Sequence, residues 1–288
     1  MRWQNRERSK NVDDRRRGGR TVKRVGGGIG IGAILIAVFS LIMGENPMEV
    51  LQNLASESTT YEQQSTGGVR SAEEDALAEM VSVVLKDTED VWDKLFREQL
   101  GRQYMKPTLV LFSGTDQSAC GFAQAATGPF YCPADQSVYI DLAFYQDLKT
   151  RFKAPGDFAM AYIIAHEVGH HVQNILGISS EVEMQKRRVS KKEANQLSVR
   201  LELQADFLAG VWAHHAQKMK NMLEKGDLEE AMNAAAAVGD DRIQMKSRGY
   251  VVPDAFTHGT SEQRMRWFRK GLVNGNLNEG DTFGVRIL

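Results

Sequence analysis

The spacing of hydrophobic positions changes several times along this chain, and each spacing predicts a different kind of element. From Ser71 onward, apolar residues recur three and four positions apart, which is typical of a helix with one buried face. Ser71-Ala-Glu-Glu74 has the pattern of a capping box, so we expect the helix to begin there. Its apolar positions include Leu77, Met80, Val81, Val84 and Leu85, and a second segment carries Val91, Trp92, Leu95 and Phe96.

The pattern after Pro107 predicts a small sheet followed by helices. Thr108–Phe112, 129–133 and Ser137–Asp141 read as strands, with a loop over 114–128. A helix is expected from an N-cap at Asp157 to a stop at Gly177, another around Glu202, and a last one from an N-cap at Ser261 to Gly271. The expected fold is therefore an α+β, mainly helical domain over residues 71–288.

One apolar run differs from the others because it contains no charged residue. Gly26–Met43 spans 18 residues, near the lower limit for crossing a bilayer core of about 30 Å. Basic residues precede it, which places the N-terminus in the cytoplasm and the following chain outside. We expect a basic cytoplasmic arm over 1–25, a transmembrane signal anchor over 26–44 in the bacterial inner membrane and a flexible linker over 45–70. A cleaved signal peptide is the alternative, but no small-x-small site directly follows Met43.

The charge of the chain is uneven. Apolar residues make up 42% and charged residues 25%, as in an ordinary globular protein. The net charge of −1 combines ten Arg or Lys and three acidic residues in 1–25, or +7, with −8 in the remainder. A basic arm can bind nucleic acid. The net negative charge of residues 26–288 argues against nucleic acid as a partner. The sequence does not predict an oligomeric state.

The candidate chemistry lies in Ala161–Gln173, which contains His166-Glu-x-x-His170. Residues four apart share one face of a helix, so both imidazoles can reach one Zn²⁺ ion. Glu167 points to the side of that face, where it can act as a general base on a water at the metal. The competing interpretation is a pair of histidines packed on a helix.

A catalytic zinc site needs a third protein ligand. Glu202 is the candidate, and Asp206, one turn further on, can accept a hydrogen bond from the free ring nitrogen of His166. A solvated acidic helix face is the alternative. The segment around them is apolar nearly all round, which indicates burial, and a buried carboxylate needs a cation or donors.

Cys120 and Cys132 are the only cysteines. In a reducing compartment they would be free thiols. If the anchor places them outside, a disulfide is expected that closes a loop of about a dozen residues and stabilises the fold by about 2–3 kcal/mol. Metal ligation by the pair is a weaker interpretation, because the zinc site is complete without sulfur.

The zinc motif followed by Glu202-x-x-x-Asp206 resembles the gluzincin arrangement, and the chain as a whole resembles the bacterial YpfJ-type family of neutral zinc metallopeptidases. The resemblance extends over roughly residues 70–288. The matching stretches are Cys120-Gly, Gly128-Pro-Phe-Tyr-Cys-Pro133, Val138-Tyr-Ile-Asp141, His166–Gln173, Glu202–Asp206, Gly239-Asp-Asp-Arg-Ile-Gln244 and Phe256–Arg264.

This resemblance implies a zincin-like domain that hydrolyses peptide bonds with zinc. It also implies that a strand near the active-site helix binds the substrate backbone, and Ser137–Asp141, with Tyr139, is the candidate. An ordinary sheet edge without this role is the alternative. A tetrahedral oxyanion needs donors besides the metal. His258 is the first candidate for that catalytic role, and Tyr139 and Arg264 are the next candidates. The alternative function is a non-catalytic, zinc-stabilised envelope scaffold or chaperone-like module.

Overall fold

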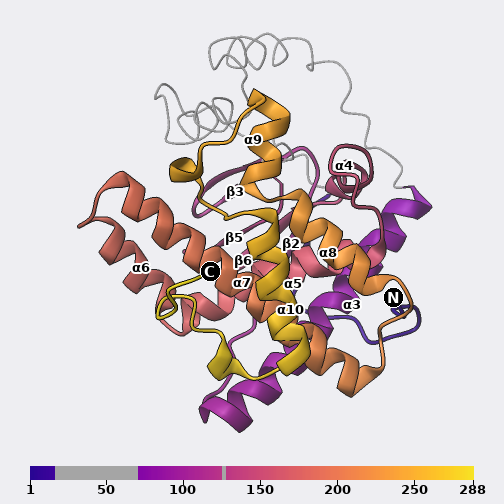
Figure 1. Cartoon of the computed structure of the whole chain (residues 1–288). Coiled ribbons are helices and arrows are strands. Elements are labelled where there is room, and N and C mark those ends of the chain that lie inside the picture. Colours follow the sequence, from indigo (N-terminus) through magenta and orange to yellow (C-terminus); the bar gives the residue numbers. More distant parts are fainter. Residues whose placement is uncertain (17–70, 125–127) are drawn as a thin grey trace.

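The computed structural model describes residues 1–16, 71–124 and 128–288 (Figure 1). Helices form most of the described chain and a small sheet lies among them, which confirms the expected α+β, mainly helical class. The helices are α3 (Ala72–Leu95), α4 (Phe144–Thr150), α5 (Asp157–Ile175), α6 (Ile178–Lys186), α7 (Lys191–Lys220), α8 (Asp227–Ala237), α9 (Asp240–Arg248) and α10 (Ser261–Asn274), with a π-helical turn η2 (Phe96–Leu100) and 3-10 turns η4 (Pro253–Ala255) and η5 (Leu277–Glu279).

The main sheet has four strands in the order β1-β2-β6-β5. Strands β2 (Thr108–Phe112) and β6 (Ser137–Asp141) have the predicted bounds, and β5 covers Phe130–Cys132. β1 (Val12–Asp14), β2 and β6 run parallel, whereas β5 is antiparallel to β6. The segment expected to be a loop contains a hairpin, β3 (Thr115–Ser118) and β4 (Gly121–Gln124). A disulfide between Cys120 and Cys132 joins the turn of this hairpin to the end of β5.

Helix α5 lies at the centre and packs on α7, α8 and α3. Close approach to α7 is possible because Gly169 has no side chain: a Cβ at this position would lie 3.0 Å from the backbone oxygen of Ala205. The contact between α7 and α10 is closer still, since a Cβ on Gly210 or Gly271 would collide with the backbone of the opposite helix. These contacts leave the middle of α7 buried on several sides, which explains why the segment 201–212 is apolar nearly all round.

Two predicted helix starts are wrong by one residue. Gly156, not Asp157, is the N-cap of α5, and the Asp157 carboxylate accepts a hydrogen bond from the Met1 amine instead. Thr260, not Ser261, caps α10 through a capping box with Gln263, and the helix continues past Gly271 to Asn274. At both sites two residues that are common N-caps stand next to each other, so the pattern could not distinguish the cap from its neighbour.

The N-terminal segment 1–16 packs on the domain, although the sequence predicted a separate arm. β1 pairs with β2, with Val12 opposite Leu109, and the Met1 amine lies 2.8 Å from Asp157 and 3.2 Å from Asp227. Arg6 forms an ion pair with Asp87, which is 1% exposed. The expected boundary at residue 71 therefore does not hold for residues 1–16.

This packing also bears on the expected membrane topology. Residues 1–16 must lie on the same side of any membrane as the domain they contact. An arm in the cytoplasm and a domain outside do not fit these contacts. The expected anchor at 26–44 and linker at 45–70 lie outside the described residues. Within the residues that the structure does describe, none of the helices has the length and apolar character needed to cross a bilayer.

Candidate metal centre

Two helices bring the three expected metal ligands together. His166 and His170 lie one turn apart on α5, and Glu202 on α7 faces both. Its Oε2 lies 3.2 Å from His166 Nε2, and its Oε1 lies 3.5 Å from His170 Nε2. The three side chains each place one ligand atom within 4.8 Å of the others.

The spacing and chemistry of these atoms fit a zinc ion. Ligand atoms held at about 2.0–2.2 Å around a tetrahedral zinc are about 3.3–3.5 Å apart. Each histidine lies close to this spacing from one Glu202 oxygen, His166 at 3.2 Å from Oε2 and His170 at 3.5 Å from Oε1. Two imidazole nitrogens and one carboxylate are also a donor set found in catalytic zinc sites, where a fourth position stays open.

Hydrogen bonds to the other ring nitrogens orient both histidines toward that point. His166 Nδ1 lies 2.8 Å from Asp206 Oδ1, as expected from the sequence, and His170 Nδ1 lies 2.9 Å from Gln173 Oε1. An Nδ1–H that donates to these oxygens leaves the Nε2 lone pair available for a metal. The role of Gln173 was missed, although its position three residues after His170 was a usable signal. Its amide nitrogen donates to Leu201 O at 2.7 Å, which ties α5 to α7 beside the site.

Asp206 is the centre of a buried network behind His166. Besides His166, its carboxylate accepts hydrogen bonds from the Tyr162 hydroxyl and from Arg264, whose Nε and Nη2 lie at 2.8 and 3.0 Å. Asp206 has 0% exposure and Arg264 has 3%. The guanidinium of Arg264 is thus paired with Asp206, and it supports a ligand histidine rather than standing ready as a free oxyanion donor.

The charges of this network shift the pKa values of its members. Burial lowers the pKa of His166, but the Asp206 carboxylate and the bond to Glu202 outweigh it and raise that pKa to about 10. Burial raises the pKa of Glu202, but the charge of His170 and hydrogen bonds from both histidines bring it well below its usual range. The Glu202 carboxylate is therefore ionised, as a metal ligand must be, and a metal ion would displace the Nε2 protons through which the histidines contact it.

Glu167 lines the same cleft but is not within the ligand cluster. It is 9% exposed, and burial raises its pKa, while the charges of His170 and His166 and a backbone hydrogen bond from Tyr131 act in the opposite direction. Tyr131 belongs to β5, so this edge strand lies next to the carboxylate. His171 holds it there: its Nε2 donates to Met105 O, and its Nδ1 accepts from the Tyr131 hydroxyl at 3.0 Å.

His258 also reaches the cleft, on a loop that Asp240 holds in place. Asp240 Oδ2 accepts hydrogen bonds from three successive backbone N–H groups, Thr257, His258 and Gly259, at 2.8, 2.6 and 3.0 Å. The other oxygen lies 3.2 Å from His258 Nδ1. Burial lowers the pKa of His258, but the bond to Asp240 and the charge of Glu202 raise it overall. The ring is half-exposed and can donate toward a bound substrate.

The expected substrate-binding role of Tyr139 is wrong. Its strand β6 is paired on both sides, so it offers no free edge. Tyr139 is 2% exposed, its hydroxyl donates to Asp135 at 2.9 Å, and its ring stacks on Phe130. The strand that borders the cleft is β5, since Phe130 and Tyr131 line it. Strand order depends on pairing between distant segments, which the local pattern could not reveal.

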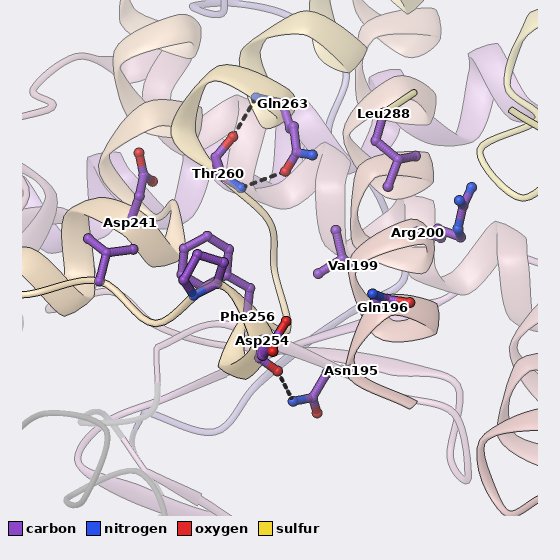
Figure 2. Close-up of a pocket in the computed structure, with 12 residues that line it drawn as sticks. Asn195, Gln196, Val199, Arg200, Asp241, Asp254, Phe256, Thr260, Gln263 and Leu288 are labelled. Atoms are coloured by element: carbon purple, nitrogen blue, oxygen red, sulfur yellow. Dashed lines mark hydrogen bonds between the residues drawn. The ribbon is translucent and has the colours of Figure 1, made fainter. Parts of the chain in front are cut away.

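The site opens into a cleft of about 1430 Å³. A second cavity, of about 520 Å³, lies on the other side of the segment 256–263, against α7. Figure 2 shows it, with Asn195 bonded to the backbone of Asp254 and the capping pair Thr260 and Gln263 at its rim. None of the described residues that line this cavity is a histidine, so the metal centre belongs to the larger cleft.

One further acidic cluster in the described residues has metal-like spacing, formed by Asp157, Asp227 and Glu230. The Met1 amine lies against two of these residues, 2.8 Å from Asp157 and 3.2 Å from Asp227. Because the Met1 amine already pairs with two of its three carboxylates, His166, His170 and Glu202 remain the candidate metal ligands.

Paired histidines on one helix, a carboxylate from a second helix and a glutamate beside them define a site of the zinc metallopeptidase type. Comparison with known proteins agrees. The profile of the family described as "Putative neutral zinc metallopeptidase" matches residues 1–283, and the chain belongs to this family. Zinc is the cofactor expected for its members. The match begins at residue 1, whereas the sequence motifs alone suggested a start near residue 70.

The chain is also similar to curated relatives. The chain is 47% identical to the uncharacterized protein YpfJ of Escherichia coli strain K12 over 291 residues, which cover 100% of both chains. It is 43% identical to the uncharacterized protein Mb2605 of Mycobacterium bovis over 195 residues, covering 64% of this chain and 65% of the relative. No solved structure matches the chain.

Proposed function

We propose that this protein is a zinc-dependent peptidase and that Glu167 is its general base. The observation that carries the proposal is the position of Glu167, adjacent in sequence to a ligand histidine and lining the cleft but outside the ligand cluster. His166, His170 and Glu202 would hold the metal. A zinc ion bound there would polarise the scissile carbonyl and make a water more acidic.

The remaining steps belong to the side chains of the chain itself. Glu167 takes a proton from the attacking water and then delivers it to the leaving amine. Burial raises the pKa of this carboxyl, which makes it a better proton acceptor than an exposed glutamate. His258 donates a hydrogen bond to the developing oxyanion, because Asp240 holds its Nδ1 and leaves the other side of the ring facing the cleft.

The substrate backbone is proposed to lie along β5. This strand pairs with β6 on one side only and ends the sheet. A peptide in extended form can add to such an edge through backbone hydrogen bonds. The position next to Glu167 would bring the scissile bond of that peptide to the metal centre.

A non-catalytic scaffold stabilised by zinc is the alternative function. A structural zinc site is closed by four protein ligands, whereas the described cluster offers three and opens into a cleft. A structural site also has no use for a buried glutamate beside its ligands. Both features favour the peptidase.

The experiment that separates the two functions is Glu167→Gln. The variant keeps the size of the side chain and all three metal ligands, so it should bind about one zinc per chain and fold normally. Its peptide hydrolysis should fall by at least about 10²–10⁴-fold, the contribution typical of a general base. Zinc content by mass spectrometry and hydrolysis of a peptide library would be measured on the same preparations.

Two comparison variants make the result specific. Glu202→Gln should lose zinc and activity together, because it alters a ligand. Glu181→Gln changes an exposed glutamate of α6 that does not line the cleft, and it should behave like the parent. Parent-like hydrolysis by zinc-loaded Glu167→Gln would contradict the mechanism and favour the scaffold.

We also propose that residues 26–44 attach the protein to the bacterial inner membrane, with the domain on the periplasmic or external side. Support for this side comes from the disulfide between Cys120 and Cys132, since such bonds persist in oxidising compartments. Because residues 1–16 pack on the domain, we place this arm on the same side, so the proposed attachment replaces the sequence-based expectation of a cytoplasmic arm and a single crossing of the membrane.

A further inference from the structure

One wall of the active-site cleft carries positive charge that the proposed hydrolysis does not use. Helix α4, the residues just after it and helix α9 form this wall. We call it the cationic wall, and its basic side chains that line the cleft are Arg151, Lys153, Arg242, Lys246 and Arg248.

The two parts of the cationic wall form one continuous surface. Lys246 on α9 donates a hydrogen bond from Nζ to the backbone oxygen of Arg151, at 2.9 Å. This bond fixes the end of α4 against α9. A ligand that lies along the wall would therefore meet cations from both elements at once.

The acidic side chains of the wall already have partners. Asp147 lies 3.6 Å from Arg151, and Asp240 is engaged by the backbone of the His258 loop. Lys153 and Arg242, in contrast, are exposed, and their side chains have no ion-pair or hydrogen-bond partner in the described part of the chain. These two cations are thus available to a ligand.

The local charge of the wall is opposite to that of most of the chain. Residues 26–288 carry a net charge of −8, since the whole chain is −1 and residues 1–25 are +7. A group of like charges on one wall of a cleft attracts oppositely charged ligands to that wall. At β5, the described residues Pro129, Phe130 and Pro133 that line the cleft carry no charge. Arg264, the remaining Arg or Lys of the lining, is paired with Asp206, so the cations available to a ligand lie on the cationic wall.

We propose that the cleft selects peptides that carry aspartate or glutamate on the side of the scissile bond that lies over α4 and α9, with Lys153 and Arg242 as the specificity-determining residues. The inference rests on the proposed function, because it names the substrate class of the same site. It also predicts a binding preference that can be measured without turnover.

The test uses zinc-loaded Glu167→Gln full-length protein and fluorescent peptides. The peptides share one neutral central sequence and carry glutamates on the N-terminal side, on the C-terminal side, or glutamines at both. Fluorescence anisotropy at low salt should show about ten-fold tighter binding for one of the two glutamate peptides, the effect of two partly exposed charge contacts. The preference should shrink at about 0.5 M salt because exposed charges are then screened.

Variants with reversed charge test which residues cause the preference for glutamate peptides. In the same Glu167→Gln background, Lys153→Glu with Arg242→Glu should abolish the preference or invert it, and Lys153→Gln with Arg242→Gln should reduce it. The matched control is Arg97→Glu with Arg102→Glu, two exposed cations outside the cleft that give the same change in net charge. This control should retain the preference, and circular dichroism with zinc analysis would check the fold of each variant.

The outcomes of the two proposals are distinguishable. Equal binding of glutamate and glutamine peptides would overturn the specificity proposal even if the parent enzyme cleaves both. Loss of the preference in the Arg97 and Arg102 control would show that overall charge, not the cationic wall, causes it. A glutamate preference without any cleavage by the parent would leave the specificity standing and contradict the proposed hydrolysis.

Discussion

Replacing Asp206 by asparagine tests the buried network that supports the metal centre. The carboxylate accepts four hydrogen bonds, from Tyr162, His166 and twice from Arg264. Asparagine has one oxygen and one NH₂ group in their place, so its NH₂ would face the N–H donors of Arg264. The variant also removes the negative charge that pairs with a guanidinium only 3% exposed.

The magnitude follows from this geometry. Breaking a buried ion pair by removing one partner costs about 3–5 kcal/mol, because the other charge stays buried without compensation. At about 2–4 °C per kcal/mol for a domain of this size, Tm should fall by about 6–20 °C. His166 also loses the acceptor that orients it, so zinc affinity should weaken by about 10–100-fold.

Urea unfolding would be measured with zinc and with a chelator, so that lost metal binding is separated from lost ion pairing. Asp254→Asn is the matched control, because Asp254 is exposed and its ion pair with Lys192 should contribute less than about 1 kcal/mol. Arg264→Met in the Asp206→Asn background removes the unpaired cation and should recover part of the stability. If Asp206→Asn unfolds within about 1 kcal/mol of the parent in chelator and binds zinc equally well, the network does not support the site.

Three further predictions concern other parts of the molecule. His258→Ala should retain zinc while kcat falls by about 10²–10³-fold, as for loss of one oxyanion donor; an unchanged kcat would remove His258 from the mechanism. In protein isolated without reductant, Cys120 and Cys132 should resist alkylation, and intact mass with and without reductant decides this; two alkylated thiols before reduction would contradict the disulfide. In spheroplasts, external protease should digest both an epitope within residues 1–16 and the domain; digestion of the domain alone would show that the arm lies on the other side of the membrane.

The sequence by itself determined the parts of the site that depend on neighbours along the chain. His166, Glu167 and His170 have their relative positions fixed by one turn of helix, so their spacing predicts their geometry. Strands β2 and β6 were predicted with their bounds because alternation and turn signals are also local. Glu202 and Asp206 could be placed near a cation because their surroundings were too apolar for unpaired carboxylates.

Only the tertiary structure decided which distant segments meet. Val12 pairs with Leu109, and the basic arm therefore belongs to the domain, although its charge suggested a separate segment. Strand order placed β5, not β6, at the cleft, which moved the candidate substrate edge away from Tyr139. Periodicity reports which face of an element is buried, but not its partner, because many partners offer an apolar face of similar size. The pairing of α4 with α9 through Lys246 depends on such long-range packing, and for this reason the cationic wall could not be predicted from the sequence.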